Sequence, residues 1–145
     1  MERQRQVAFA LAAIFGLLSA LHVVWAFGGR LANGSVIPVV EGKPVFRPSV
    51  AITLVVAALL AAAALVVLVR AGVILSSFPP HLATLAAAVL GSILVLRAIG
   101  DFRLVGLFKS VRSTAFAQWD SWLYSPLSLA LGIATLWLAT RPRRS

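Results

Sequence analysis

The chain has 145 residues, of which 61% are hydrophobic and only 12% are charged, and its formal net charge is +9. Soluble domains contain about 45–50% apolar and about 25% charged residues, and a single domain of this length cannot hide such an apolar surplus. These figures exclude a water-soluble globular domain and indicate a protein that faces lipid. The basic residues flank apolar runs, which fits lipid head groups better than nucleic acid. The absence of Cys excludes disulfides and thiolate metal sites.

Four apolar runs are long enough to cross a bilayer as helices. A hydrocarbon core of about 30 Å needs roughly 20 helical residues at about 1.5 Å each. The first run follows a polar head that ends at Gln6. It is too long for the apolar region of an ordinary signal peptide, so we expect an uncleaved first span. The predicted spans cover residues 7–27, 49–69, 82–99 and 117–139.

Small residues recur at intervals of four along two of these spans. Ala12, Gly16 and Ala20 form such a stripe on the first span, and Ala87 and Gly91 form one on the third. Stripes of this kind let helix backbones approach closely within a membrane. We therefore expect an all-α, four-helix membrane bundle.

Pro126 decides where the fourth helix begins. A helix from Pro126 to Thr140 would have about 15 residues and a length of roughly 22 Å, which is too short to cross. Extending it back to about Ala117 gives a full span with Pro126 as a kink, which membrane helices tolerate. This extension would place Asp120 and Tyr124 on one helix face.

The loop after the first span predicts a short hairpin. Two extended arms, residues 36–40 and 43–46, flank Glu41-Gly42, a dipeptide typical of a tight turn. Pro38 and Pro44 restrict such arms to edge or extended positions. We expect this segment to lie over the helix ends.

The loop before the last span predicts an amphipathic helix. Between Asp101 and Arg112, apolar residues are spaced against Arg103 and Lys109 in a pattern that suits a short helix lying in the membrane interface.

Residues 1–145 are interpreted as one four-span domain with both termini on the same side of the membrane. The loops after the first and third spans then share the opposite face. Basic residues do not orient the domain, because the termini and the second loop carry six Lys and Arg residues while the first and third loops carry seven.

Three motifs resemble those of a family of small bacterial four-span membrane proteins of unknown function: HVVWAFGG at residues 22–29, RAIGDFRLVGLFK at residues 97–109 and DSWLYSPL at residues 120–127. The resemblance covers nearly the whole chain. It implies the four-helix fold and a membrane location, and it assigns no catalytic role to any residue.

Polar and aromatic side chains gather at the face that these motifs share. We expect them to line a small interfacial pocket, because Arg and Asp can hold the polar head of a ligand while Trp and Tyr offer apolar walls. The alternative is that these side chains only satisfy one another. The candidate ligand-binding residues are His22, Trp25, Arg97, Asp101, Arg103, Asp120, Trp122 and Tyr124.

Both aspartates need partners at this depth, because a lone carboxylate would cost several kcal/mol or take up a proton. Asp101 lies four residues after Arg97, a spacing that favours a helix-end ion pair. Asp120 has no such neighbour in the sequence. It should find a partner across the bundle, for which the candidates are Arg97, Arg103, Lys109 and His22.

Two functions fit these observations. The first is a binding or accessory protein of the cell membrane, surrounded by membrane lipids, that holds a lipid-like ligand or a partner helix. The second is a small membrane enzyme that uses Asp101 and Asp120 as acid and base on an apolar substrate, which rests on fold-level analogy with sterol isomerase-like helical proteins. The sequence has no metal-site spacing, phosphate loop, dinucleotide fingerprint or nucleophilic-serine motif, so we expect no metal, no cofactor and no nucleic-acid partner.

Overall fold

A computed structural model of the chain describes residues 2–28, 37, 39–40, 43–44 and 48–142. Three long helices are continuous: α1 (Glu2–Ala26), α2 (Val50–Arg70) and α3 (Pro80–Ile99). The fourth joins α4 (Ala115–Trp119), a π-helical turn η1 (Asp120–Tyr124) and α5 (Ser125–Thr140) end to end. All four are long and apolar enough to cross a membrane. The predicted four-helix membrane fold is therefore confirmed.

Side-chain caps determine where two of the helices begin. The Ser49 side chain accepts the backbone N–H of Ile52 at 3.2 Å at the start of α2. Thr114 accepts the N–H of Ala117 at 3.1 Å in the same way, so the fourth helix starts two residues earlier than expected. Caps of this kind satisfy N–H groups that the first helical turn leaves open.

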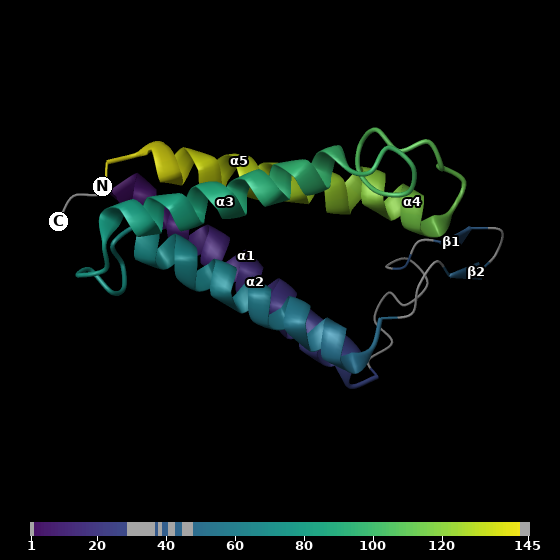
Figure 1. Cartoon of the computed structure of the whole chain (residues 1–145), viewed down its shortest axis with the longest axis horizontal. Helices are drawn as coiled ribbons and strands as arrows, with labels where there is room; N and C mark the ends of the chain where they lie inside the picture. Colours follow the sequence, from purple (N-terminus) through teal and green to yellow (C-terminus); the bar gives the residue numbers. More distant parts are fainter. Residues whose placement is uncertain (1, 29–36, 38, 41–42, 45–47, 143–145) are drawn as a thin grey trace.

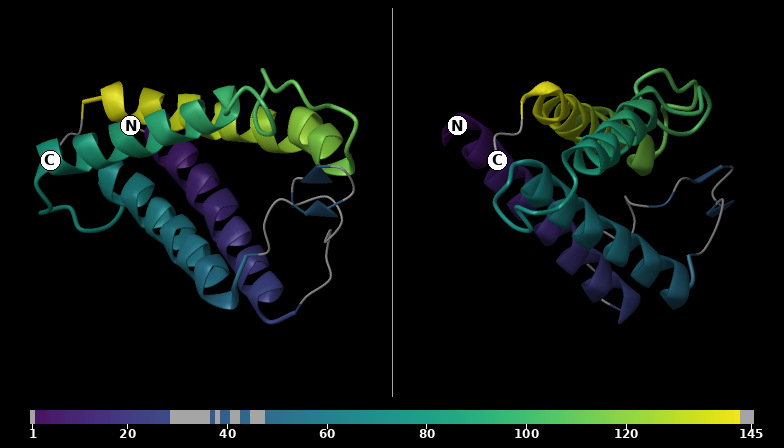
Figure 2. Two further views of the ribbon diagram at one scale, coloured as in Figure 1. Left: turned by 45° about the vertical axis from the view of Figure 1, so that its right-hand side comes forward. Right: turned by 60° about the vertical axis from the view of Figure 1, so that its left-hand side comes forward.

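The helices form two antiparallel pairs. α1 packs along α2, α3 packs along α5, and the pairs converge at the end of the molecule where α1 starts and α5 finishes (Figure 1). Away from that end the pairs diverge, so that the molecule has the outline of a V in all three views (Figure 2). Arg3 and Arg141 both lie over the ring of Trp137 at the converging end. The two ends of the chain therefore lie at the same end of the bundle, as expected for four spans.

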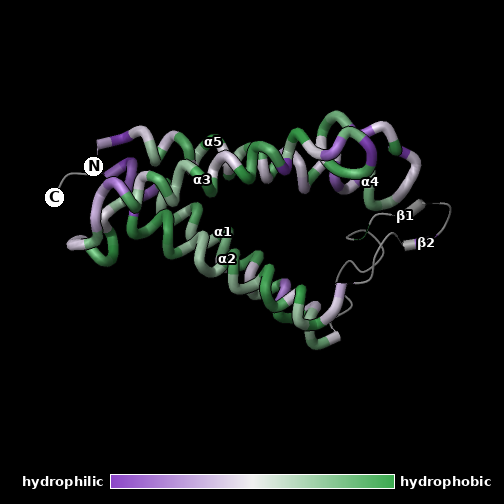
Figure 3. Tube along the Cα trace, in the orientation of Figure 1, coloured by the Kyte–Doolittle hydropathy of each residue, from purple (hydrophilic) through white to green (hydrophobic). Residues whose placement is uncertain are grey.

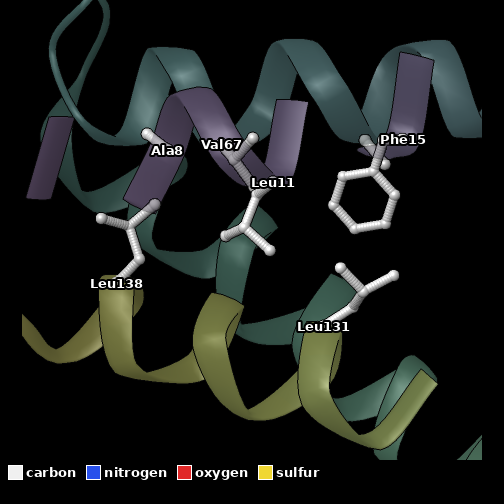
Figure 4. Packing of buried hydrophobic residues seen from close by; sticks show 7 residues of the cluster. Ala8, Leu11, Phe15, Val67, Leu131 and Leu138 are labelled. Carbon is white, nitrogen blue, oxygen red and sulfur yellow. The ribbon is translucent and has the colours of Figure 1, made fainter. Parts of the chain in front are cut away.

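The hydrophobic core lies where the pairs converge (Figure 4). Leu131 and Leu138 of α5 point toward Leu11 and Phe15 of α1, with Val67 of α2 beside them, and all five are buried. Lipid tails are as apolar as these side chains, so van der Waals packing holds the pairs together.

α3 and α5 touch through two glycines. A Cβ at Gly132 would lie 2.9 Å from the carbonyl oxygen of Gly91, so the small-residue contact expected on the third span is present. On the first span, Ala12 of the predicted stripe packs against the core, but a Cβ at Gly16 would meet no described atom of another element within 4 Å. α1 instead holds α2 through a 2.8 Å hydrogen bond from Ser19 Oγ to the carbonyl oxygen of Ala57.

Hydropathy follows this arrangement (Figure 3). The helices are hydrophobic over most of their length, while hydrophilic residues gather at the converging end and between α3 and α4. A bilayer covering the middle of each helix would leave both groups at its faces.

A minimal hairpin follows α1. β1 (Val39–Val40) pairs with β2 (Lys43–Pro44) in antiparallel register, with Val39 opposite Pro44 and Val40 opposite Lys43. This pairing has the register of the predicted hairpin. Its turn at Glu41-Gly42 and the outer ends of its arms lie outside the described residues.

The amphipathic helix predicted between Asp101 and Arg112 is wrong. The chain there is an irregular loop that runs from the end of α3 to the start of α4. Gly100, Phe102 and Gly106 adopt φ angles of +89°, +63° and +97°, in the left-handed region that no right-handed helix can include. Apolar spacing alone did not reveal these backbone turns.

Candidate functional site

Asp120 is the centre of a buried ionic cluster. Its side chain is 0% exposed, and both carboxylate oxygens are engaged. Oδ1 accepts Arg97 Nη2 at 2.8 Å, while Oδ2 accepts Lys109 Nζ at 3.0 Å and the backbone N–H of Gly106 at 2.8 Å. The cluster therefore links α3, the following loop and η1 through one carboxylate.

Lys109 is fully buried as well, although it belongs to a loop. Its ammonium group donates to Asp120, to the carbonyl oxygen of Gly106 at 2.9 Å and to Ser121 Oγ at 2.8 Å. An ammonium has three N–H donors, so each donor has an acceptor here. Complete hydrogen bonding of this kind lets a charged pair exist away from water.

The π-helical turn brings two side chains of the fourth helix to Arg97. The backbone N–H of Ser125 reaches the carbonyl oxygen of Asp120, five residues back, so the turn contains one extra residue. Asp120 and Ser125 both face α3 as a result, and Ser125 Oγ accepts Arg97 Nη1 at 3.4 Å. The turn directly precedes Pro126, which has no N–H to donate. The fourth helix therefore continues through Pro126, as expected, and the π turn accommodates the hydrogen bond that Pro126 cannot donate.

Asp101 caps its own loop. Its Oδ1 accepts the backbone N–H groups of Arg103, Leu104 and Val105 at 2.9, 2.7 and 2.9 Å. These donors, with that of Val105 first, hold the pKa of the carboxyl below its ordinary value of 3.8.

The ion pair predicted between Arg97 and Asp101 is wrong. Gly100 ends α3 in the left-handed region, so Asp101 no longer lies one helical turn above Arg97. Both ion pairs within the described residues end on Asp120. The expectation that Asp120 finds Arg97 or Lys109 across the bundle is confirmed.

The loop after α3 packs tightly against the end of α3 because Gly100 and Gly106 have no side chain. A Cβ at Gly100 would overlap the carbonyl oxygen of Val105, and a Cβ at Gly106 would overlap that of Ile99. The N–H of Leu107 also returns to the carbonyl oxygen of Ala98 at 2.8 Å. Every charged residue and glycine of the segment from Arg97 to Lys109, apart from Arg103, thus serves to fold the loop against α3 and η1.

The comparisons with known proteins bear on this same segment. The model of a family described as "Protein of unknown function (DUF3995)" matches residues 15–135, which include Arg97, Lys109 and Asp120. The chain belongs to this family. Neither a curated protein nor a solved structure matches it significantly. Family membership agrees with the four-span fold, and it supplies no reaction or ligand.

The other candidate ligand-binding residues do not belong to the ionic cluster around Asp120. His22 and Trp25 lie in the last turns of α1, in the other helix pair, where that pair has diverged from α4 (Figures 1 and 2). A ring nitrogen of His22 lies 2.7 Å from the carbonyl oxygen of Leu18, and the His22 ring stacks edge-on against Trp25 at 5.0 Å. Such contacts are those of a packed histidine.

Aromatic residues of the fourth helix also have separate surroundings. Trp122 is 85% exposed, as suits a tryptophan at the level of the membrane interface. Tyr124 packs against Phe116, with ring centroids 6.2 Å apart. Arg103 is exposed on the loop. Of the expected set, the structure therefore brings only Arg97 and Asp120 into the ionic cluster.

Lys109, Gly106 and Ser125 belong to the cluster but were not among the candidate site residues. The sequence position of Lys109 could have indicated its role, because a lysine directly after the apolar pair Leu107-Phe108 needs an acceptor if it is buried. No three described His, Asp or Glu side chains converge as metal ligands would.

Two hollows formed by described residues lie between α2 and α3. A groove of about 400 Å³ follows the two helices, and a smaller hollow of about 130 Å³ adjoins it near the α2–α3 turn. Val66 and Ala86 line both, so the two hollows are neighbours. The larger one is lined only by apolar residues: Leu59, Ala62, Ala63, Val66, Leu82, Leu85, Ala86, Val89, Leu90 and Ile93.

Proposed function

We propose that this protein is a binding protein of the cell membrane that holds the acyl chain of a lipid-like ligand in the groove between α2 and α3. The groove itself is the observation that carries the proposal. Its volume of about 400 Å³ lies within the range of roughly 300–1,000 Å³ typical of ligand pockets. The helices that form it are membrane spans, so the ligand reaches the groove from the bilayer.

Small side chains make the groove. Ala62 and Ala63 of α2 face Ala86 of α3, while larger neighbours such as Leu59 and Ile93 form its rims and remain more than half exposed. An alkyl chain would gain dispersion contacts with both walls that the two helices do not supply to each other. The two helices belong to different pairs, and these pairs diverge away from the α2–α3 turn (Figure 2).

Arg97 would hold a polar head group beyond the Ile93 end of the groove. It lies four residues after Ile93, and thus on the same face of α3 one turn nearer the loop. Its side chain is 34% exposed even though Asp120 and Ser125 hold one side of the guanidinium. The remaining donors of this guanidinium are available to an anionic or hydroxylated head.

The geometry disfavours the alternative of an enzyme with two acidic residues. A general acid or base must reach the substrate within hydrogen-bond distance. Asp120 is fully buried with both oxygens bonded, and one oxygen of Asp101 serves three backbone N–H groups. Asp120 therefore cannot accept a substrate proton without unfolding its own surroundings, and Asp101 is an exposed loop residue that does not line the groove.

Filling the groove tests the proposal. Ala62→Leu places a larger side chain in the groove, and Ala61→Leu places the same side chain on the neighbouring exposed position that does not line it. Both proteins would be purified in mild detergent, checked for helical content and analysed by native mass spectrometry. We expect the parent and Ala61→Leu to retain one lipid mass and Ala62→Leu to lose it.

Two outcomes would contradict the proposal. One is equal lipid retention by Ala61→Leu and Ala62→Leu. The other is a dimer mass without lipid in the parent that Ala62→Leu converts to monomer, which would show that a second copy fills the groove.

A further inference from the structure

Two arginines share one tryptophan at the converging end of the bundle. The guanidinium carbon of Arg141 lies 4.8 Å from the ring centroid of Trp137, and that of Arg3 lies 5.7 Å from the same centroid. Both arginines are exposed, while Trp137 is partly buried against the core. The face of one indole therefore orients two positive charges from opposite ends of the chain.

A third arginine holds the backbone beneath them. Arg70, at the end of α2, is 3% exposed and donates to the carbonyl oxygens of Ala139, at 2.9 Å, and of Arg141. These carbonyls lie at the C-terminal end of α5, which is the negative end of the helix dipole. Arg70 thereby fixes the position from which the side chain of Arg141 extends.

The described part of the chain supplies no carboxylate to Arg3 or Arg141 within ion-pair distance. The nearest acid in the sequence, Glu2, accepts a 3.4 Å hydrogen bond from Gln6. Two guanidinium groups directed to one ring repel each other, and an anion between them would remove that repulsion. Arginine binds phosphate oxygens through paired N–H donors.

We propose that Arg3 and Arg141 bind the phosphate of an anionic phospholipid head group over Trp137. The site lies at the ends of α1 and α5, both of them membrane spans, and tryptophans at span ends lie at the level of lipid head groups. A phosphodiester with no cation of its own matches two arginines that have no carboxylate partner among the described residues, whereas a choline head group adds a third positive charge. This site is separate from the α2–α3 groove and does not depend on the function proposed for it.

Lipid selectivity tests the proposal. The full chain would be reconstituted in vesicles of equimolar phosphatidylcholine and phosphatidylglycerol, extracted, and analysed for retained lipid by native mass spectrometry. We expect the parent to retain phosphatidylglycerol preferentially and Arg3→Gln or Arg141→Gln to reduce that preference about fivefold each, because each variant loses a guanidinium that would bind the phosphate directly. Trp137→Leu should also reduce it, although no charge changes.

Arg5→Gln is the matched control, because Arg5 is exposed on the same helix end and lies over none of the described rings. This variant should keep the preference within about twofold. An equal loss in Arg5→Gln and Arg3→Gln would show general surface attraction and overturn the site. Displacement of the lipid by excess inorganic phosphate would overturn the lipid assignment, since the phosphate group alone would then suffice.

Discussion

Lys109 and Asp120 form an ion pair in which both side chains are completely buried, with Nζ 3.0 Å from Oδ2. The two residues are eleven positions apart, and the pair fastens the loop after α3 to the start of the fourth helix. Desolvating two charges costs several kcal/mol, so the pair is tolerated because its hydrogen bonds are complete. Its main consequence is structural, since it leaves neither group free for a ligand.

Removing the carboxylate should be more harmful than removing the whole pair. Asp120→Asn leaves Lys109 as a buried cation without its counter-ion, and we expect a loss of about 3–5 kcal/mol in the free energy of unfolding. The double variant Asp120→Asn/Lys109→Met should be more stable than Asp120→Asn alone. Unfolding by SDS titration in mixed micelles measures both. Full additivity of the two single effects would show that the residues do not interact.

The two loop glycines should not tolerate a side chain. Gly100→Ala and Gly106→Ala place a Cβ against a backbone carbonyl at positive φ, so each should lower the free energy of unfolding by more than about 2 kcal/mol. Gly16→Ala is the control, because its Cβ meets open space on a helix and should be neutral or stabilising by up to about 1 kcal/mol. The same SDS titration compares the three. Similar losses at all positions would refute the close packing of the loop.

The cap at Asp101 should depend on pH. Its folded pKa lies below the ordinary 3.8, so its contribution to stability is complete above that value and is lost as the pH falls through the folded pKa. Asp101→Asn should reduce stability by about 1 kcal/mol near neutral pH, as for other side-chain caps. The difference between parent and variant, followed by thermal unfolding, should shrink below about pH 4. A difference that stays constant into acid would mean that the charge of Asp101 contributes nothing.

Both termini should lie on the cytoplasmic side. The number of Lys and Arg residues on each side does not orient the domain, but the site proposed for Arg3 and Arg141 over Trp137 binds anionic phospholipid, which gives the cytoplasmic leaflet its negative surface potential. Reporter proteins fused after residue 145 and before residue 1 should therefore both score as cytoplasmic, and a reporter inserted after Arg112 should score on the opposite side. Termini that score on different sides would contradict the four-span topology itself.

Much of this fold could be predicted from composition and periodicity, because a lipid solvent demands long apolar helices. The pairing of Asp120 was also predictable, since a buried carboxylate needs a cation. The pair between Arg97 and Asp101 was not formed because helical spacing applies only while the helix continues, and Gly100 ends it. A residue with a positive φ turns the backbone but does not alter the spacing of apolar residues in the sequence. The apolar pattern therefore still predicts a helix where the chain in fact turns.

The separation of His22 from Asp120 could not be read from the sequence either. Topology places the ends of α1 and α4 at one membrane level, but the angle between the helix pairs decides whether they meet. That angle follows from side chains such as Leu131 and Phe15 that pack only at the converging end. Because the pairs diverge, the described residues form a bonded cluster in one pair and an apolar groove between the pairs, and His22 does not reach Asp120.

An experimental density map of the protein, purified with its native lipids and crystallised from a lipid phase, tests the central claim most directly. The account predicts elongated density in the groove between Ala62 and Ala86, with its polar end near Arg97, and no ligand density inside the cluster around Asp120. Ligand density in contact with the Asp120 carboxylate, or a helix of a second copy seated between α2 and α3, would contradict it.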